Sequence, residues 1–175
     1  MISEYKAILD RDPAATKMEA LLMPWLHALV VHRHITHPLY LSRMRFTARL
    51  VSQIMRGITG IEIHPWAQIG EGMMIDHGMW VVIGETTVIG DNVTIFHGVT
   101  LGGTGKEKGK RHPTLWDNVT IGAGATLLGS ISVGNNVNIW AMTLVSGKNV
   151  PSDITVVWNP PIVIEENGIK TRRKL

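Results

Sequence analysis

The second half of the chain carries an aliphatic residue at every sixth position. The series begins at Ile63, Ile69 and Ile75, shifts by two residues, and then runs from Ile83 to Leu101 and from Leu115 to Val145. Neither the helical period of 3.6 nor the strand period of 2 explains this spacing. A sustained period of six predicts a parallel β-helix, in which three repeats form one triangular coil with the aliphatic side chains inside.

Small and turn-forming residues accompany the repeats. Glycine often follows the aliphatic residue, and a small or β-branched residue lies four places after it. Pairs of turn-forming residues recur at Asp91-Asn92, Asp117-Asn118 and Asn135-Asn136. Because Asn and Asp tolerate unusual turn conformations, we expect the chain to turn at these pairs.

The period is interrupted between Leu101 and Leu115, which are 14 residues apart where 12 or 18 would keep the phase. Residues 102–113 must therefore leave the coil as a loop that is rich in glycine and basic residues. The loop superficially resembles a phosphate-binding P-loop, but it lacks the required spacing and the strand-to-helix context, so we do not expect ATP binding. It is either a solvated loop or an arm that carries Arg111 and His112 to a site.

The first 59 residues favour helices. Asp12-Pro13-Ala14 predicts a helix start, and the helix that follows contains Pro24 as a kink or break. The residues from Arg43 to Met55 have an apolar face. His32, His34 and His37 are interpreted as a polar helix end before Pro38 rather than a metal site, because no carboxylate is near them in the sequence.

These patterns divide the chain into three parts. Residues 1–59 form an N-terminal helical segment, residues 60–157 form the β-helix with the protruding loop 102–113, and residues 158–175 form a C-terminal tail. The ends of a β-helix need covering, and the helical segment can cap one of them.

Composition narrows the class of protein. The 175 residues are 45% hydrophobic and 18% charged, with a net charge of +3, which does not by itself indicate nucleic-acid binding. The absence of cysteine excludes disulfides and thiolate metal sites. The chain shows no signal-peptide core and no apolar run of 18 residues, so we expect a soluble cytoplasmic protein without a membrane segment.

An acid and a histidine stand side by side within the repeats, at Asp76-His77. Histidine has an unperturbed pKa of about 6.5, which suits proton transfer near neutral pH. A second polar cluster, Lys110-Arg111-His112-Pro113, ends the loop. A single histidine is more often structural than catalytic, so the surrounding motifs must decide.

Five motifs occur in an order that resembles serine O-acetyltransferases, which belong to the hexapeptide-repeat acyltransferases. They are Ile61-Glu62-Ile63-His64-Pro65, Ile75-Asp76-His77-Gly78, Val82-Ile83-Gly84-Glu85-Thr86, Gly98-Val99-Thr100-Leu101-Gly102-Gly103-Thr104-Gly105 and Lys110-Arg111-His112-Pro113. The resemblance runs from about Asp10 to about Pro160. It implies a left-handed β-helix and a homotrimer with active sites between subunits. The chain resembles a short form of the family.

The implied reaction transfers acetyl from acetyl-CoA to the hydroxyl of L-serine and gives O-acetylserine for cysteine biosynthesis. His77 matches the general base of the family, and Glu62 matches the acid that orients it, although the family often has Asp there. Metal is not implied. Asp12 and Asp76 match the residues that bind the serine ammonium group. Arg111 and His112 match those that bind its carboxylate. Gly103 and Ala123 match those that lie along the pantetheine arm of CoA.

Several tryptophans stand where the family usually has small residues: Trp66, Trp80, Trp116, Trp140 and Trp158. They either point outward at the corners of the coils or narrow the CoA groove and the serine site. We favour the outward orientation. If they narrow the sites, the chain is impaired or selects another acceptor.

Two other functions stay open at this point. A hexapeptide acetyltransferase for a sugar would have no use for Asp12, Asp76 and Arg111, which suit an amino acid. A catalytically inactive scaffold would bind a partner without turnover. In the family the C-terminal tail can dock into O-acetylserine sulfhydrylase and usually ends in isoleucine. This tail ends in Leu175 after a basic run, so we expect a weak complex or none.

Overall fold

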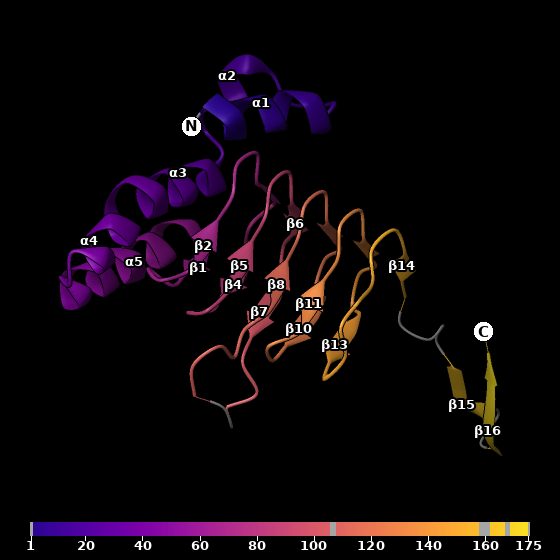
Figure 1. Cartoon of the computed structure of the whole chain (residues 1–175). Coiled ribbons are helices and arrows are strands. Elements are labelled where there is room, and N and C mark those ends of the chain that lie inside the picture. The colour runs from indigo at the N-terminus through magenta and orange to yellow at the C-terminus, as the bar shows by residue number, and fades with distance from the viewer. Residues whose placement is uncertain (1, 106–107, 158–161, 167–168, 175) are drawn as a thin grey trace.

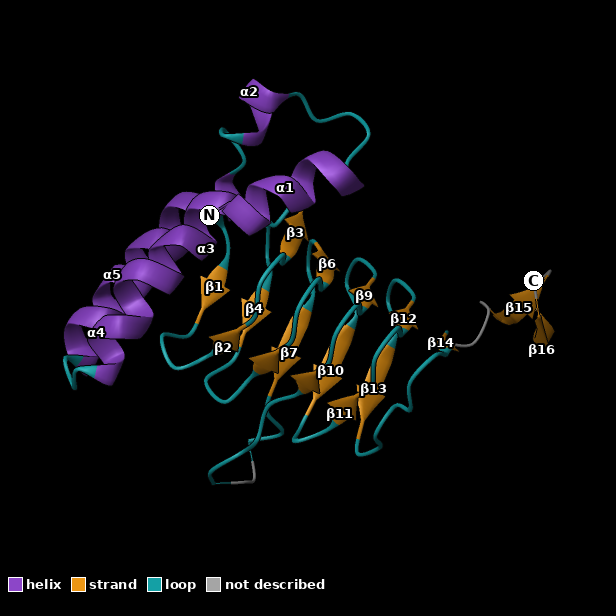
Figure 2. Cartoon of the chain, turned by 45° about the horizontal axis from the view of Figure 1, so that its top comes forward, coloured by secondary structure: helices purple, strands orange, loops and turns teal. Residues whose placement is uncertain are grey.

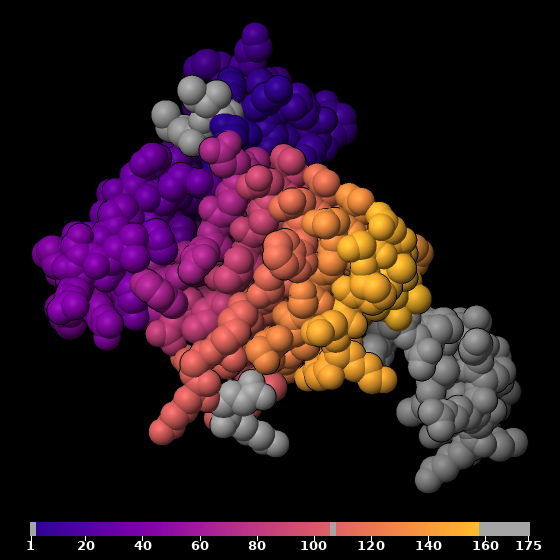
Figure 3. Space-filling view, in the orientation of Figure 1, coloured from indigo at the N-terminus to yellow at the C-terminus, as the bar shows by residue number. Residues whose placement is uncertain are grey.

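The computed structural model describes residues 2–105, 108–157, 162–166 and 169–174. A group of helices packs against one end of a β-helix, whose coils follow one another toward the C-terminus (Figure 1). The protruding loop leaves the coils between β7 (Thr100–Gly102) and β8 (Thr114–Leu115). In the space-filling view this loop extends away from the body of the coils (Figure 3).

The N-terminal segment is helical, as predicted. Its helices are α1 (Ile2–Arg11), α2 (Lys17–Ala20), α3 (Pro24–Val31), α4 (His37–Leu41) and α5 (Arg45–Thr59), with a π-helical turn at His32–Thr36. None of the described helices is long and apolar enough to cross a membrane.

The predicted helix start at Asp12-Pro13-Ala14 is wrong. These residues form a turn after α1, in which the Asp12 carboxylate accepts a hydrogen bond from the backbone N–H of Ala14 at 2.9 Å. The next helix begins at Lys17, because Thr16 and Glu19 form a capping box. Pro24 does mark a break: it is the first residue of α3, where its missing N–H has no cost.

The predicted helix end before Pro38 is also wrong, because the backbone stays helical from Pro24 to Leu41. In the π-helical turn, the N–H of His37 donates to the carbonyl of His32, five residues earlier. Proline in an ordinary helix lacks a donor, and its ring clashes with the carbonyl four residues earlier. The wider π turn allows the chain to pass through Pro38 and remain helical.

The predicted parallel β-helix is confirmed. Its strands stack in parallel into three sheets, one for each side of the coil (Figure 2). The first sheet contains β1 (Glu62–Ile63), β4 (Val82–Ile83), β7, β10 (Thr126–Leu128) and β13 (Leu144–Ser146). The second contains β2 (Gln68–Ile69), β5 (Val88–Ile89), β8 and β11 (Ser132–Val133). The third contains β3 (Met74–Asp76), β6 (Thr94–Phe96), β9 (Thr120–Ile121), β12 (Asn138–Ile139) and β14 (Thr155–Val156).

The aliphatic residue of each repeat lies inside the coil. The fully buried members include Ile75, Ile83, Ile95, Leu101, Leu115, Ile121 and Leu127. Burying one such side chain contributes about 1.5–3 kcal/mol, so the six-residue period is also the pattern of the core. The predicted turns are confirmed as well, since Asn92, Asn118 and Asn136 have left-handed φ angles of 57°, 58° and 56°.

Two insertions interrupt the regular coil. Ile83 pairs with Leu101 eighteen residues later, which is the regular coil length. Ile75 pairs with Ile95 twenty residues later, so two extra residues lie in the corner between β3 and β4. Ile89 pairs with Leu115 twenty-six residues later, so eight extra residues lie in the loop. The first insertion directly follows Asp76 and lies in the corner that contains His77, and the second contains Arg111-His112.

The described part of the C-terminal tail forms two strands, β15 (Ile162–Glu166) and β16 (Ile169–Lys174), which pair antiparallel. Trp158 and Leu175 lie outside the described residues.

Candidate active site

His77 lies in the enlarged corner between β3 and β4. Within this corner His77, Gly78 and Trp80 have left-handed φ angles of 59°, 60° and 65°. This conformation costs a bulky residue such as Trp80 about 1–3 kcal/mol, and such strain often occurs at functional sites. The side chain of His77 is 76% exposed and is therefore open to a ligand or to a neighbouring chain.

Residues from the next coils lie in line with His77. The strand register places His97, Ala123 and Ala141 at the same corner, one, two and three coils further along. The ring of His97 stands edge-on to that of His77, with centroids 6.0 Å apart. Successive coils are about 4.8 Å apart, so the row continues past His97 to Ala123, the residue predicted for CoA.

His97 was not among the predicted site residues. The six-residue phase was its signal, because His97 stands two residues after Ile95 just as His77 stands two residues after Ile75, and these two isoleucines pair. Asp76 is the last residue of β3 and directly precedes His77. Its Oδ1 is 3.8 Å from Nε2 of His77, which is too long for a hydrogen bond but close enough for charge interaction.

Glu62, predicted to orient His77, is bound by two arginines of α5. Its Oε1 is 2.8 Å from Nη2 of Arg49, and its Oε2 is 3.0 Å from Nη1 of Arg56. Within the described residues, Glu62 makes no hydrogen bond or ion pair with His77. The structure therefore places Glu62 in β1, near this edge of the first sheet, but directs its carboxylate to α5.

Asp12 lies in the turn after α1. Its side chain accepts the bond from Ala14, and in the described part of the chain it makes no hydrogen bond or ion pair with another predicted site residue. Its neighbour Arg11 attaches α1 to the coils by donating to Thr94 Oγ1 at 3.0 Å and to Asn92 Oδ1 at 3.1 Å.

His112 is buried at the end of the loop, where Thr86 fixes its tautomer. The backbone N–H of Thr86 lies 3.2 Å from Nδ1 of His112 and can only donate, so Nδ1 is unprotonated. The Thr86 hydroxyl, 2.9 Å from Nδ1, also donates to it and accepts from the backbone N–H groups of Arg111 and His112. The neutral ring therefore carries its proton on Nε2 and presents it as a donor.

The environment favours this neutral form. Burial, followed by the positive charges of Arg111 and Lys110, lowers the pKa of His112, while Glu85 opposes the shift. Gly84 provides the space for the ring, because a Cβ at that position would collide with Cδ2 and Nε2 of His112.

Arg111 forms an ion pair with Glu85, and its backbone N–H donates to the hydroxyl of Thr86. Its side chain is one-third exposed. Gly103, predicted to lie along the CoA arm, faces this group: a Cβ there would be 3.2 Å from the Arg111 carbonyl and 3.5 Å from Nε2 of His112. The structure thus brings Gly103, Arg111 and His112 together.

The two groups of predicted residues lie at opposite edges of the first sheet. Asp76 and His77 precede β4, whereas Arg111 and His112, from the loop after β7, pack against the corner that follows β4. The sheet is about 10 Å wide between Val81 and Gly84, at ~3.3 Å per residue. One chain therefore presents two half-sites rather than one closed site.

Three of the tryptophans point outward, as favoured from the sequence. Trp80, Trp116 and Trp140 are exposed, and Trp116 donates from its indole to Ser132 Oγ at 3.0 Å. Trp66 is half-buried and packs against Tyr40, with ring centroids 5.3 Å apart. Trp80 also lines a cavity of about 210 Å³ beside the His77 corner.

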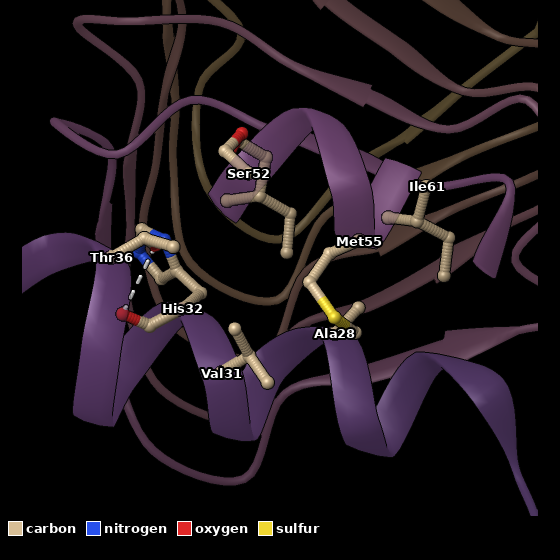
Figure 4. A pocket seen from close by; sticks show the side chains of 8 residues that line it. Ala28, Val31, His32, Thr36, Ser52, Met55 and Ile61 are labelled. Atoms are coloured by element: carbon tan, nitrogen blue, oxygen red, sulfur yellow. Dashed lines mark hydrogen bonds between the residues drawn. The ribbon is translucent and has the colours of Figure 1, made fainter. Parts of the chain in front are cut away.

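Of the three histidines before Pro38, His32 is buried, His37 is half-buried and His34 is exposed. His32 lines a cavity of about 10 Å³ between α3 and α5, together with Thr36 and Ser52 (Figure 4). Its Nε2 donates to the carbonyl of Ala67 at 3.1 Å, and burial lowers its pKa to about 4. Among the described residues, no three His, Asp or Glu side chains gather in a way that could hold a metal ion.

Comparison with known proteins finds serine acetyltransferases both by sequence and by structure. A curated protein from Helicobacter pylori named serine acetyltransferase is 58% identical over 86% of this chain and 88% of its own length. One of the same name from Bacillus subtilis is 54% identical over 96% of this chain and 77% of its own. The crystal structure of serine acetyltransferase from Neisseria gonorrhoeae in complex with serine superposes with a TM-score of 0.85 at 43% identity, over 91% of this chain and 65% of that one. No protein-family model matches the sequence.

Proposed function

The chain belongs to the serine acetyltransferase family, and we propose that it transfers acetyl from acetyl-CoA to the hydroxyl of L-serine. The product is O-acetyl-L-serine, and the reaction serves cysteine biosynthesis. The observation that carries this proposal is the identity of 58% with a relative that is aligned over 88% of its own length. The position of the two half-sites at the two insertions in the coil supports it.

The chemistry requires a base, because a serine hydroxyl is a poor nucleophile at neutral pH. We assign this role to His77, whose exposed ring can reach a hydroxyl that approaches the corner. His77 takes the proton while the hydroxyl oxygen attacks the thioester carbonyl. It then gives the proton to the departing thiol, which restores the neutral ring. His97, edge-on to His77, limits the directions in which that ring can turn.

Serine carries a positive ammonium group and a negative carboxylate, so its binding site needs side chains of both charges. Asp76, next to His77, and Asp12 are assigned to the ammonium group. Arg111 and the Nε2–H of His112 are assigned to the carboxylate, since a guanidinium and a neutral N–H donor both suit its oxygens. This assignment favours an amino acid over a sugar as the acceptor.

We assign the pantetheine arm of acetyl-CoA to the row of corners that runs from His77 past His97 to Ala123. Ala123 is half-buried and Ala141 is exposed, and their small side chains suit a close approach of the arm. Gly103, beside Arg111 and His112, provides a second place where a side chain would block close approach.

Because the half-sites lie at opposite edges of one sheet, we propose that a neighbouring subunit completes each active site. In a homotrimer with threefold symmetry, the His77 corner of one subunit faces the Arg111 loop of the next. An apolar stripe on α5 supports such contacts. Phe46, Leu50, Ile54 and Ile58 are spaced by four residues and are all exposed, and exposed apolar surface of this kind is typical of interfaces.

The test is thiol release from acetyl-CoA, measured with L-serine, with a panel of sugars and without acceptor, and followed by identification of the product. Serine-dependent release with formation of O-acetylserine supports the proposal. Release with sugars alone favours the sugar acetyltransferase. Absence of release with every acceptor favours the inactive scaffold.

The complex with O-acetylserine sulfhydrylase stays a prediction, because Leu175 lies outside the described residues. We propose weak docking at most. Calorimetry with a peptide of the last ten residues and the sulfhydrylase of the same cell tests it. Micromolar binding that disappears when Leu175 is removed would contradict weak docking.

A further inference from the structure

We propose that Arg49 and Arg56 are positioning residues for acetyl transfer and that they act through Glu62. The proposal rests on the proposed function and on the role that the family resemblance gives Glu62, which is to orient His77. We call the group of Arg49, Glu62 and Arg56 the arginine clamp.

The clamp holds the carboxylate at both oxygens. Arg49 binds Oε1 at 2.8 Å, and Arg56 binds Oε2 at 3.0 Å. The two arginines are seven residues apart on α5, which is about two helical turns and places them on the same face. The Glu62 side chain is only 18% exposed. A carboxylate bound on both oxygens by two guanidinium groups has one orientation, and its charge stays fixed in space.

The helix that carries the clamp is fastened to the His77 corner. At the end of α5, Gly60 has a left-handed φ of 72°, and its carbonyl accepts a hydrogen bond from the N–H of Trp80 at 3.0 Å. A Cβ on Gly60 would collide with the sulfur of Met79. Arg56, Glu62, Met79 and Trp80 line the same cavity of about 210 Å³. A shift of α5 would therefore move both the clamp and the corner.

Stability alone does not explain the clamp. Arg49 Nη1 is buried and, among the described residues, has no hydrogen-bond partner. A buried donor without a partner is unfavourable, and partly exposed ion pairs contribute little to folding. If α5 served only for packing, an apolar side chain in place of Arg49 would stabilise the fold more. The arrangement is instead suited to fixing a charge.

The negative charge of Glu62 matters when His77 becomes positive in the transition state. Asp76 is the nearest acid to His77, at 3.8 Å, and His97 faces the ring from the next coil. Glu62 adds a negative charge at the start of the first sheet, and the clamp fixes where that charge lies. Loss of Arg56 frees one oxygen of Glu62 and lets the carboxylate move. The expected effect falls on kcat, because the row of residues assigned to the pantetheine arm, from His77 past His97 to Ala123, includes neither Arg56 nor Glu62.

The experiment is a double-mutant cycle on the full chain with Arg56→Gln, Glu62→Gln and the double variant, plus Arg56→Lys. Arg56→Gln should lower kcat roughly tenfold or more, since a displacement of ~1 Å can cost about 100-fold. The KM for acetyl-CoA and the melting temperature should remain unchanged. In the Glu62→Gln background, Arg56→Gln should have no further effect. Arg56→Lys should restore part of kcat. Arg45→Gln, on the same helix, serves as the matched control and should leave kcat unchanged.

Losses that add in the double variant would overturn the proposal, because Arg56 would then act independently of Glu62. An equal loss in Arg45→Gln, or no loss in Arg56→Gln, would overturn it as well. Wild-type protein without serine-dependent thiol release would refute the proposed function and this proposal together. Wild-type activity with additive losses would refute only the clamp.

Discussion

The ring of His97 stands edge-on to the ring of His77, with centroids 6.0 Å apart, although twenty residues separate them in the chain. Asp76 pairs with Phe96, and the N–H of Gly98 donates to the carbonyl of Met79, so the two extra residues of the first coil lie between Asp76 and Met79. His77 lies in this enlarged corner, where its side chain is 76% exposed and its ring meets that of His97.

The first prediction concerns the base. His77→Ala should lower kcat by roughly 10²–10⁴-fold, which is the usual contribution of a general base. His97→Ala should lower it less, because His97 only limits the movement of His77. Steady-state kinetics with a melting curve for each variant tests both. The exposed His27 on α3 is the matched control. If His77→Ala retained near-native kcat, the proposed mechanism would be wrong.

The second prediction concerns the loop. Arg111→Ala removes a charge-assisted contact worth about 1.5–3 kcal/mol, so the KM for serine should rise roughly 10- to 100-fold. The KM for acetyl-CoA should change little. Lys108→Ala, in the same loop, should leave both values unchanged. Equal increases for both substrates would contradict a role of Arg111 in carboxylate binding.

The third prediction concerns the space for His112. Gly84→Ala places a methyl group where the His112 ring lies, so the ring must move and the KM for serine should rise. The control is Gly57→Ala in α5, where the added Cβ meets nothing within 4 Å. That change should stabilise the fold by about 0.5–1 kcal/mol, since alanine is the better helix former. An unchanged KM in Gly84→Ala would show that the position of the ring is not important.

Much of the fold follows from the sequence, because the side chains of a β-helix repeat with its geometry. Ile75, Ile83 and Leu101 are fully buried as their spacing predicts, and the interruption before Leu115 is the loop. The helix boundaries were predicted less well. Asp12-Pro13 resembles a helix start, but the capping box at Thr16 and Glu19 decides the boundary, and a π turn carries the helix through Pro38.

The site was predicted only in part, because partners from other elements cannot be read from a repeat. Glu62 looks like a free acid in its motif, yet Arg49 and Arg56 bind it from α5. His97 could have been found by counting the first coil as twenty residues. The hydrogen bonds from Thr86 that fix the tautomer of His112 depend on the path of the loop, which the sequence does not specify.

The fourth prediction concerns acid stability. Burial, with the charges of His37, Arg33 and His64 as smaller causes, lowers the pKa of His32 to about 4, from 6.5 when unfolded. The folded state therefore favours neutral His32, and its contribution is complete above pH 6.5 and is lost as the pH falls toward 4. Between pH 7.5 and 5 the loss is about 2 kcal/mol. Urea unfolding at both pH values measures it. His32→Gln should reduce this difference, and an equal pH dependence in the variant would assign it to other groups.

The most direct test of the central claim combines two impaired variants at a serine concentration well below the raised KM of Arg111→Ala, where each variant alone shows little activity. His77→Ala and Arg111→Ala subunits are unfolded together, refolded as a mixture and assayed for serine-dependent thiol release. If each active site takes His77 from one subunit and Arg111 from the next, random assembly leaves about a quarter of the sites intact in symmetric trimers. We predict recovery to about this fraction of wild-type activity, with no recovery when either variant is refolded alone. A mixture that stays as inactive as its components would contradict an active site shared between subunits.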